Sequence, residues 1–99
     1  MSRRYIFSAE ARIEYFHAIA WYEDRSPGLG QEFSKAIDTL LQRIVANPEH
    51  FPKFFHVARK AKLKRFTPYS LFFKAEGNEV YVFAVFHGAR DPEDLQRRI

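Results

Sequence analysis

The spacing of apolar residues changes once along this chain, close to Asn47-Pro48, and this change constrains the fold more than any other feature. Before it, two long segments carry apolar side chains three or four residues apart, as in a helix with one buried face. After it, short aromatic and β-branched runs cover residues 57 to 66, 69 to 75 and 79 to 87. The pattern predicts a helical pair followed by a small sheet, which is an α+β domain.

A short strand and a first helix are predicted at the N-terminus. Residues 3 to 7 read RRYIF and predict the strand, and Ser8 is a suitable N-cap with Glu10 in the first helical turn. We expect the helix to run from Ala9 to about Arg25 and to pack through one apolar stripe. The residues of that stripe are Ile13, Phe16, Ile19, Ala20 and Trp21.

A second helix is predicted directly afterwards. Ser26 and Pro27 are expected to be its N-cap and its first residue, and Asn47-Pro48 is expected to end it. Because the connection is so short, the two helices must lie antiparallel as an αα-hairpin. The apolar face of the second helix comprises Leu29, Phe33, Ala36, Ile37, Leu40, Leu41, Ile44 and Val45.

Three antiparallel strands are predicted in the C-terminal half, with Gly77-Asn78 as a two-residue hairpin turn between the last two. The last strand, residues 79 to 87, is apolar at nearly every position, so we expect it to be central and covered on both faces. Residues 93 to 98 are expected to add one helical turn. The predicted order is β-α-α-β-β-β, with the αα-hairpin packed on one face of a small, mostly antiparallel four-stranded sheet.

Length and composition restrict the classes of function. A chain of 99 residues buries one core, so residues 1 to 99 are expected to form a single domain. The chain has no cysteine and its four histidines are scattered, which argues against disulfides and a structural metal, and no cofactor is expected. No apolar run is long enough for a signal peptide or a membrane span, so we expect a soluble, cytoplasmic protein without a membrane partner.

The formal net charge of +4 is concentrated in the C-terminal half. Residues 53 to 66 contain six basic side chains and no acidic one, which would attract a polyanion or an acidic protein surface. The alternative is a solvated strand edge that its charges protect against aggregation. The basic residues are Lys53, Arg59, Lys60, Lys62, Lys64 and Arg65.

Four short motifs appear in an order that points to a known family. They are WY near the end of the first helix, NPEHFP after the second, PYSLFF in a strand and HGARDP after the last strand. With the predicted element order, this arrangement resembles the RelE/ParE superfamily of toxins from toxin-antitoxin systems, from about Tyr5 to Arg98. The family usually reads Phe-Pro-Tyr where this chain has Phe66-Thr67-Pro68-Tyr69, which leaves the register of that strand open.

The resemblance implies a small cytoplasmic toxin that a cognate antitoxin neutralises and that arrests growth when released. RelE-like members cleave mRNA in the ribosomal A site without a metal, whereas ParE-like members poison DNA gyrase and show no nuclease chemistry. The long helix pair, the HGARDP ending, the moderate charge and the lack of a tyrosine after position 81 favour the ParE-like, plasmid-stabilisation side. A generic nucleic-acid-binding module without toxicity is a third hypothesis.

The candidate site residues depend on which activity is correct. In a nuclease, His87 is the candidate acid or base, Arg90 the candidate phosphate clamp, and Tyr69 a residue that stacks on a base or hydrogen-bonds the backbone. The candidates for binding neighbouring phosphates, or a protein target, are Arg59, Lys60, Lys62, Lys64 and Arg65.

Structural roles are open for the same residues. His87 would then cap the turn after the strand, and Arg90 would be tied to Asp91, to Glu93 or to C-terminal carbonyls. Tyr69 would be partly core, because it shares one face of its strand with Leu71 and Phe73. In every case we expect the apolar grooves of the helix pair and the cationic patch to attract an amphipathic antitoxin segment that carries carboxylates.

Overall fold

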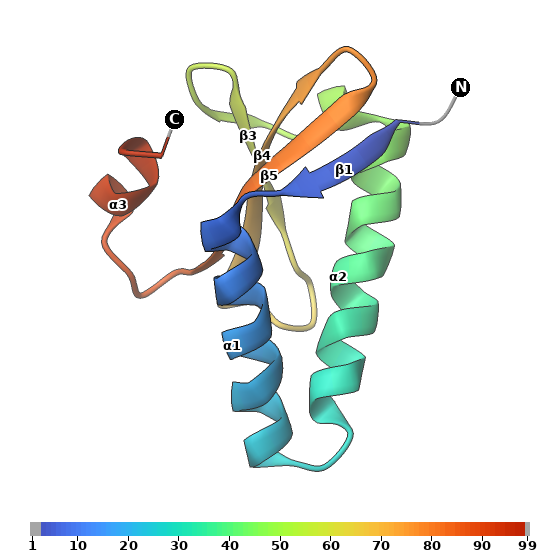
Figure 1. The fold of residues 1–99 in the computed structure, drawn as a ribbon, viewed down its shortest axis with the longest axis vertical. Helices are drawn as coiled ribbons and strands as arrows, with labels where there is room; N and C mark the ends of the chain where they lie inside the picture. The colour runs from blue at the N-terminus through green and yellow to red at the C-terminus, as the bar shows by residue number, and fades with distance from the viewer. Residues whose placement is uncertain (1–2, 99) are drawn as a thin grey trace.

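The helix pair covers one face of a twisted sheet, and a short C-terminal helix packs near the other face (Figure 1). The computed structural model describes residues 3–98. Its helices are α1 (Ala9–Arg25), α2 (Leu29–Ala46) and α3 (Pro92–Gln96), with a 3-10 turn at Pro48–His50. Its strands are β1 (Arg4–Phe7), β2 (Lys53–Phe55), β3 (Ala58–Lys62), β4 (Tyr69–Glu76) and β5 (Glu79–His87).

The α+β class and the packing of the helix pair on the sheet are confirmed, but the sheet has five strands rather than four. The strand order is β1-β5-β4-β3-β2, in which β1 runs parallel to β5 and all other neighbours are antiparallel. The additional strand is β2, which forms a hairpin with β3 around His56 and Val57. His56 has a φ of 53°, a conformation that ordinary residues seldom adopt and that gives no clear sequence signal here.

The strand expected at residues 57 to 66 is shorter, because β3 ends at Lys62. The following loop turns onto the helices, where Leu63 and Phe66 are buried. The Phe66 ring packs edge-to-face on Tyr22 and Phe33, with centroids 4.8 and 5.2 Å apart. These aromatic contacts stabilise a loop that the alternation of residues alone predicts as strand.

The apolar stripe predicted for α1 is wrong at four of its five residues, and only Ile19 packs against the core. Ile13 is 56% exposed, Phe16 58% and Trp21 49%, and Ala20 is exposed as well. The stripe that faces α2 and the sheet consists of Ala11, Tyr15, Ala18 and Tyr22, joined along one side by the partly buried Ile19. Tyrosine can lie on the buried face of the helix because its ring packs in the core while its hydroxyl forms a hydrogen bond with a polar partner. For Tyr15 that partner is the Ser34 hydroxyl, 2.7 Å away.

Ser8 is confirmed as the N-cap of α1, since its hydroxyl accepts a hydrogen bond from the Ala11 N–H at 3.0 Å. The cap predicted for α2 is wrong, because Ser26 ends α1 and α2 begins at Leu29. Glu23 reaches across from α1 and accepts hydrogen bonds from the N–H groups of Gly28 and Gly30, both at 3.0 Å. The Glu23 carboxylate, which belongs to the neighbouring helix, therefore caps the N-terminus of α2 in place of a local side chain.

A β-bulge divides β5 and decides which residues face the helix pair. Phe73 pairs with Val82 and Phe72 pairs with Ala84, so Phe83 is an extra residue without a partner on β4. Val80, Val82 and Val85 lie in the core under the helix pair, whereas Ala84 and Phe86 lie on the opposite face with Leu95 of α3. The strand is covered on both faces, as predicted, but the bulge exchanges odd and even positions beyond it.

Candidate functional site

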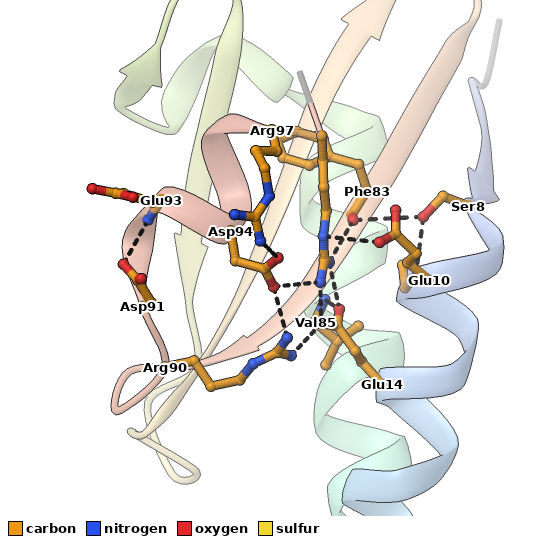
Figure 2. A network of polar contacts seen from close by, with 12 residues as sticks. Ser8, Glu10, Glu14, Phe83, Val85, Arg90, Asp91, Glu93, Asp94 and Arg97 are labelled. Carbon is orange, nitrogen blue, oxygen red and sulfur yellow. Dashed lines mark hydrogen bonds and ion pairs between the residues drawn. The ribbon is translucent and has the colours of Figure 1, made fainter.

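The free edge of β5 is where α1 and the C-terminal segment meet. β1 stops at Phe7 and leaves the later part of β5 without a neighbouring strand on that side. Glu14 of α1 accepts a hydrogen bond from the Val85 N–H at 3.0 Å, and Arg98 donates to the Phe83 carbonyl at 3.2 Å (Figure 2). These side chains satisfy backbone groups that a sixth strand would otherwise pair.

Glu14 is the centre of an ionic network. Its carboxylate pairs with Arg98 at 2.8 Å and with Arg90, and Asp94 of α3 pairs with the same two arginines at 3.0 and 2.7 Å (Figure 2). The side chains of Arg98 and Glu14 are 8% and 11% exposed, so both charges are largely removed from water. Arg98 Nε is buried without a hydrogen bond and lies 3.4 Å from the Glu10 carboxylate. Such burial is tolerated only because every charge faces an opposite charge.

Two groups of the network, Arg98 and Asp94, have pKa values shifted in favour of their charged forms. The hydrogen bond with Glu14 raises the pKa of the Arg98 guanidinium above its ordinary value. The hydrogen bond from Arg97, assisted by the charges of Arg98 and Arg90, lowers the pKa of Asp94 below its ordinary value. Ion pairs and hydrogen bonds of these charged groups therefore connect α3 and the turn before it to α1 and to β5.

The structure brings Tyr69 and His87 together. They are paired across β4 and β5, and their rings meet edge-to-face with centroids 5.1 Å apart. Tyr69 also packs on Phe33 of the core, and burial raises the pKa of its hydroxyl. His87 accepts a hydrogen bond at Nδ1 from the Ala89 N–H at 3.0 Å, as the turn-capping alternative expects.

The Arg90 side chain makes its ion pairs and its ring contact with other residues than Tyr69 and His87. Its guanidinium lies 4.8 Å from the centre of the Phe86 ring, which belongs to the cluster on the α3 face, whereas His87 lies with Tyr69 on the helix-pair face. The structural role expected for Arg90 is present, but its partners are Glu14 and Asp94 rather than Asp91 or Glu93. Asp91 instead caps α3 by accepting a hydrogen bond from the Glu93 N–H at 3.0 Å.

Sequence reasoning missed Glu14 and Arg98. The two are separated by 84 positions, so no local spacing links them. In the structure, Glu14 follows the buried Ala11 by three residues and precedes the buried Ala18 by four, which places it on the buried stripe of α1, but the stripe predicted from the sequence lies on another face. An acidic residue on a buried stripe requires a cationic partner, and the C-terminal arginines supply it.

The five predicted phosphate- or target-binding residues separate into three places. Arg59 donates to the Phe51 carbonyl at 2.7 Å and is thereby tied to its own chain. The Lys60 ammonium lies 5.7 Å from the Phe72 ring, beside a hollow of about 110 Å³ on the α3 face that Ser70 and Arg90 also line. The remaining three, Lys62, Lys64 and Arg65, line a groove between α2 and the β3–β4 loop.

We call this third location the cationic groove. It has a volume of about 250 Å³, and Arg43 of α2 adds a fourth cation to its wall. The remaining lining residues are Ala36, Thr39, Leu40 and Leu63.

A second groove, the apolar groove, lies between β1 and the two long helices. Its volume is about 430 Å³. The exposed Phe16 lies in its wall, and the exposed Ile13 and Trp21 lie on the outer side of the same helix. The lining residues are Tyr5, Ile6, Phe7, Arg12, Tyr15, Phe16, Asp38 and Leu41. Exposed apolar patches are typical of sites that bind another protein, a ligand or a membrane.

Two features of the described residues bear on other classes of function. Within residues 3–98, no group of three histidine or acidic side chains is placed to hold a metal ion. Over the same residues, no helix is both long enough and apolar enough to cross a membrane.

Comparison with known proteins gives a consistent result. The family model described as the ParE toxin of type II toxin-antitoxin systems, parDE, matches residues 5–92. No curated protein matches the chain significantly. A solved structure of a chromosomal ParDE toxin-antitoxin system from P. aeruginosa has a similar fold, with a TM-score of 0.73 and 15% sequence identity over 88% of this chain and 96% of that one. Because the family model spans nearly all of the fold, the chain belongs to the ParE toxin family of type II toxin-antitoxin systems.

Proposed function

We propose that this chain is a cytoplasmic growth-arrest toxin that inhibits DNA gyrase by binding, and that a cognate antitoxin neutralises it. The position of Arg90 is the observation that favours inhibition by binding over RNA cleavage. Its charge is matched by Glu14 and Asp94, and its guanidinium packs over the Phe86 ring, whereas His87 packs on Tyr69.

Metal-free cleavage of RNA has specific geometric needs. A base, an acid and a cation must converge on one phosphate at hydrogen-bond distance. Tyr69 and His87 lie together, but burial raises the Tyr69 pKa, which opposes a role as general base near neutral pH. We therefore keep ribosome-dependent mRNA cleavage as the alternative, with Lys60 and Arg90 beside one hollow as the observation in its favour.

The antitoxin is expected to bind the apolar groove. This groove lies beside Phe16 and Ile13, which are 58% and 56% exposed. An amphipathic segment that inserts two or three apolar side chains would remove this surface from water. Neutralisation then follows if the bound antitoxin also covers the surface that contacts gyrase.

The test separates binding from cleavage in one experiment. The chain is expressed from a tightly repressed promoter, and DNA breaks, DNA supercoiling and mRNA integrity are followed in the arrested cells. His87→Ala is compared with His50→Ala, a change at an exposed histidine in the 3-10 turn. We expect DNA damage with intact message, and toxicity that survives both substitutions.

Other outcomes would contradict this proposal. Rapid loss of message without DNA breaks, abolished by His87→Ala alone, would establish the ribonuclease alternative. Absence of arrest, together with salt-dependent binding of nucleic acid, would favour the non-toxic binding module.

A further inference from the structure

We propose that two copies of this chain associate through the outer face of α1, with the two α1 helices antiparallel across a twofold axis. The inference concerns the chain alone and does not depend on the proposed function. Its contact surface is the outer stripe, which we define as the exposed residues Ile13, Phe16, His17, Ala20 and Trp21.

Helix α1 is apolar on two opposite faces. Its fully buried positions, Ala11 and Ala18, hold small side chains, whereas the larger Ile13, Phe16 and Trp21 are 56%, 58% and 49% exposed. The residues of the outer stripe recur at intervals of three and four, so they adjoin one another along one side of the helix. A contiguous apolar stripe with helical spacing, left in water by its own chain, is suited to packing against a helix of another molecule.

The charges at the two ends of α1 select a second copy and its direction. Arg12 and Asp24 are exposed and have no ion-pair partner within residues 3–98. In an antiparallel pair, Arg12 of each copy lies beside Asp24 of the other, and Glu10 lies near Arg25. The twofold axis repeats both attractions, whereas a parallel pair would place like charges together.

The same register also matches the side chains in size. Where Arg12 is opposite Asp24, an advance of four residues on one helix reaches Phe16, and a step back of four on the other reaches Ala20. The small Ala20 side chain therefore leaves room for the Phe16 ring of the other copy. Rows of residues four apart are the ridges that pack between helices most often.

The size of the stripe predicts a weak dimer. A fully buried aromatic side chain removes about 150 to 250 Å² from water. The half-exposed Phe16 and Trp21, with Ile13, therefore give roughly 600 Å² for the two copies together, which is less than the ~1,000 Å² of a stable interface. We expect association that depends on concentration, with a dissociation constant of tens of micromolar.

Sedimentation velocity of the purified chain, without antitoxin, measures this association from about 1 to 200 μM. The stripe variant is Ile13→Gln with Trp21→Gln, because neither residue lines a groove. The control is Val57→Gln, at a side chain that is 63% exposed on the β2–β3 hairpin. We expect the wild type and the control to reach the dimer over this range, and the stripe variant to associate at least about tenfold more weakly.

Trp21 gives a second readout, because it is the one tryptophan of the chain. Its emission should move to shorter wavelength as the concentration of the wild type rises, since a second copy would exclude water from the ring. Thermal unfolding of each variant verifies that it remains folded.

A charge exchange tests the direction of the helices. Arg12→Asp alone and Asp24→Arg alone should each weaken association by about tenfold, because each places like charges beside one another twice. An equimolar mixture of the two variants should associate as well as the wild type, because every introduced charge then faces an opposite one.

Three results would overturn the inference. A wild-type chain that stays monomeric at every concentration would leave the outer stripe to a different partner. Equal association of the stripe variant and the control would place the contact on another surface. Single charge variants that associate as well as the wild type would exclude the antiparallel pair. None of these results bears on growth arrest or on gyrase, so the proposed function would be unaffected.

Discussion

Basic side chains have different roles at the free edge of β5 and in the cationic groove. At the free edge of β5, Arg90 and Arg98 are matched by Glu14 and Asp94, and Arg98 is almost fully buried. Across the sheet, Arg43, Lys62 and Lys64 in the cationic groove have no carboxylate partner within residues 3–98.

The difference shows which charges the fold needs and which remain for a partner. A buried charge must find its partner inside the chain, since leaving it unpaired would cost several kcal/mol. An exposed charge needs no such partner, so it can contribute to recognition instead. Changes in the network should therefore affect stability, and changes in the grooves should affect binding.

The largest effect is expected from Glu14→Ala. It leaves Arg98 buried without its nearest carboxylate and removes the acceptor of the Val85 N–H, so we expect a loss of about 3 kcal/mol in the free energy of unfolding. Urea denaturation monitored by circular dichroism measures this loss. Glu93→Ala on the exposed side of α3 is the control and should change stability by no more than about 0.5 kcal/mol. Equal losses for the two variants would contradict a structural role for the network.

Next in size is the effect of Phe16→Ser on antitoxin binding. Phe16 is 58% exposed in the wall of the apolar groove, so its loss should cost little stability but about 1 to 2 kcal/mol of binding free energy. Calorimetric titration with the antitoxin provides the binding measurement, and Val57→Ser, at an exposed hairpin tip, is the matched control. A Phe16→Ser protein that binds as tightly as the wild type would place the antitoxin on another surface.

A smaller effect on stability is predicted when the pH is lowered. The pKa of Asp94 is lowered in the folded chain, chiefly by the hydrogen bond from Arg97. Its contribution to stability is therefore complete above the ordinary aspartate pKa of about 3.9 and is lost as the pH falls through the lower folded value. Denaturation midpoints from pH 6 down to about pH 2 should fall less for Asp94→Asn than for the wild type. Identical pH profiles for the two proteins would exclude this contribution.

The smallest effect on stability is expected in the cationic groove. Lys62→Ala with Lys64→Ala should change the free energy of unfolding by no more than about 0.5 kcal/mol, because both side chains are exposed and lack an internal partner within the described residues. The same urea titration used for Glu14→Ala gives the comparison directly. A loss as large as that of Glu14→Ala would mean that the groove cations support the fold.

Several elements were predictable from the sequence because their causes are local. The extent of α1 follows from Ser8 and the helical spacing after it, and the β4–β5 hairpin follows from Gly77-Asn78 between two aromatic runs. The order of these elements and the short motifs between them also indicated the toxin family. The shared face of Tyr69, Leu71 and Phe73 followed from the alternation of a regular strand.

Other features depend on contacts between distant residues. The bulge at Phe83 reverses the alternation in β5 and places His87 beside Tyr69, although nothing in the strand's apolar run marks the extra residue. The sequence alone determined the helix pair, most of the sheet and the family, because spacing and turn residues act over a few positions. Only the tertiary structure decided which face of α1 is buried and that Glu14 binds Arg90 and Arg98. Those choices depend on how the packed elements satisfy buried backbone groups and charges together.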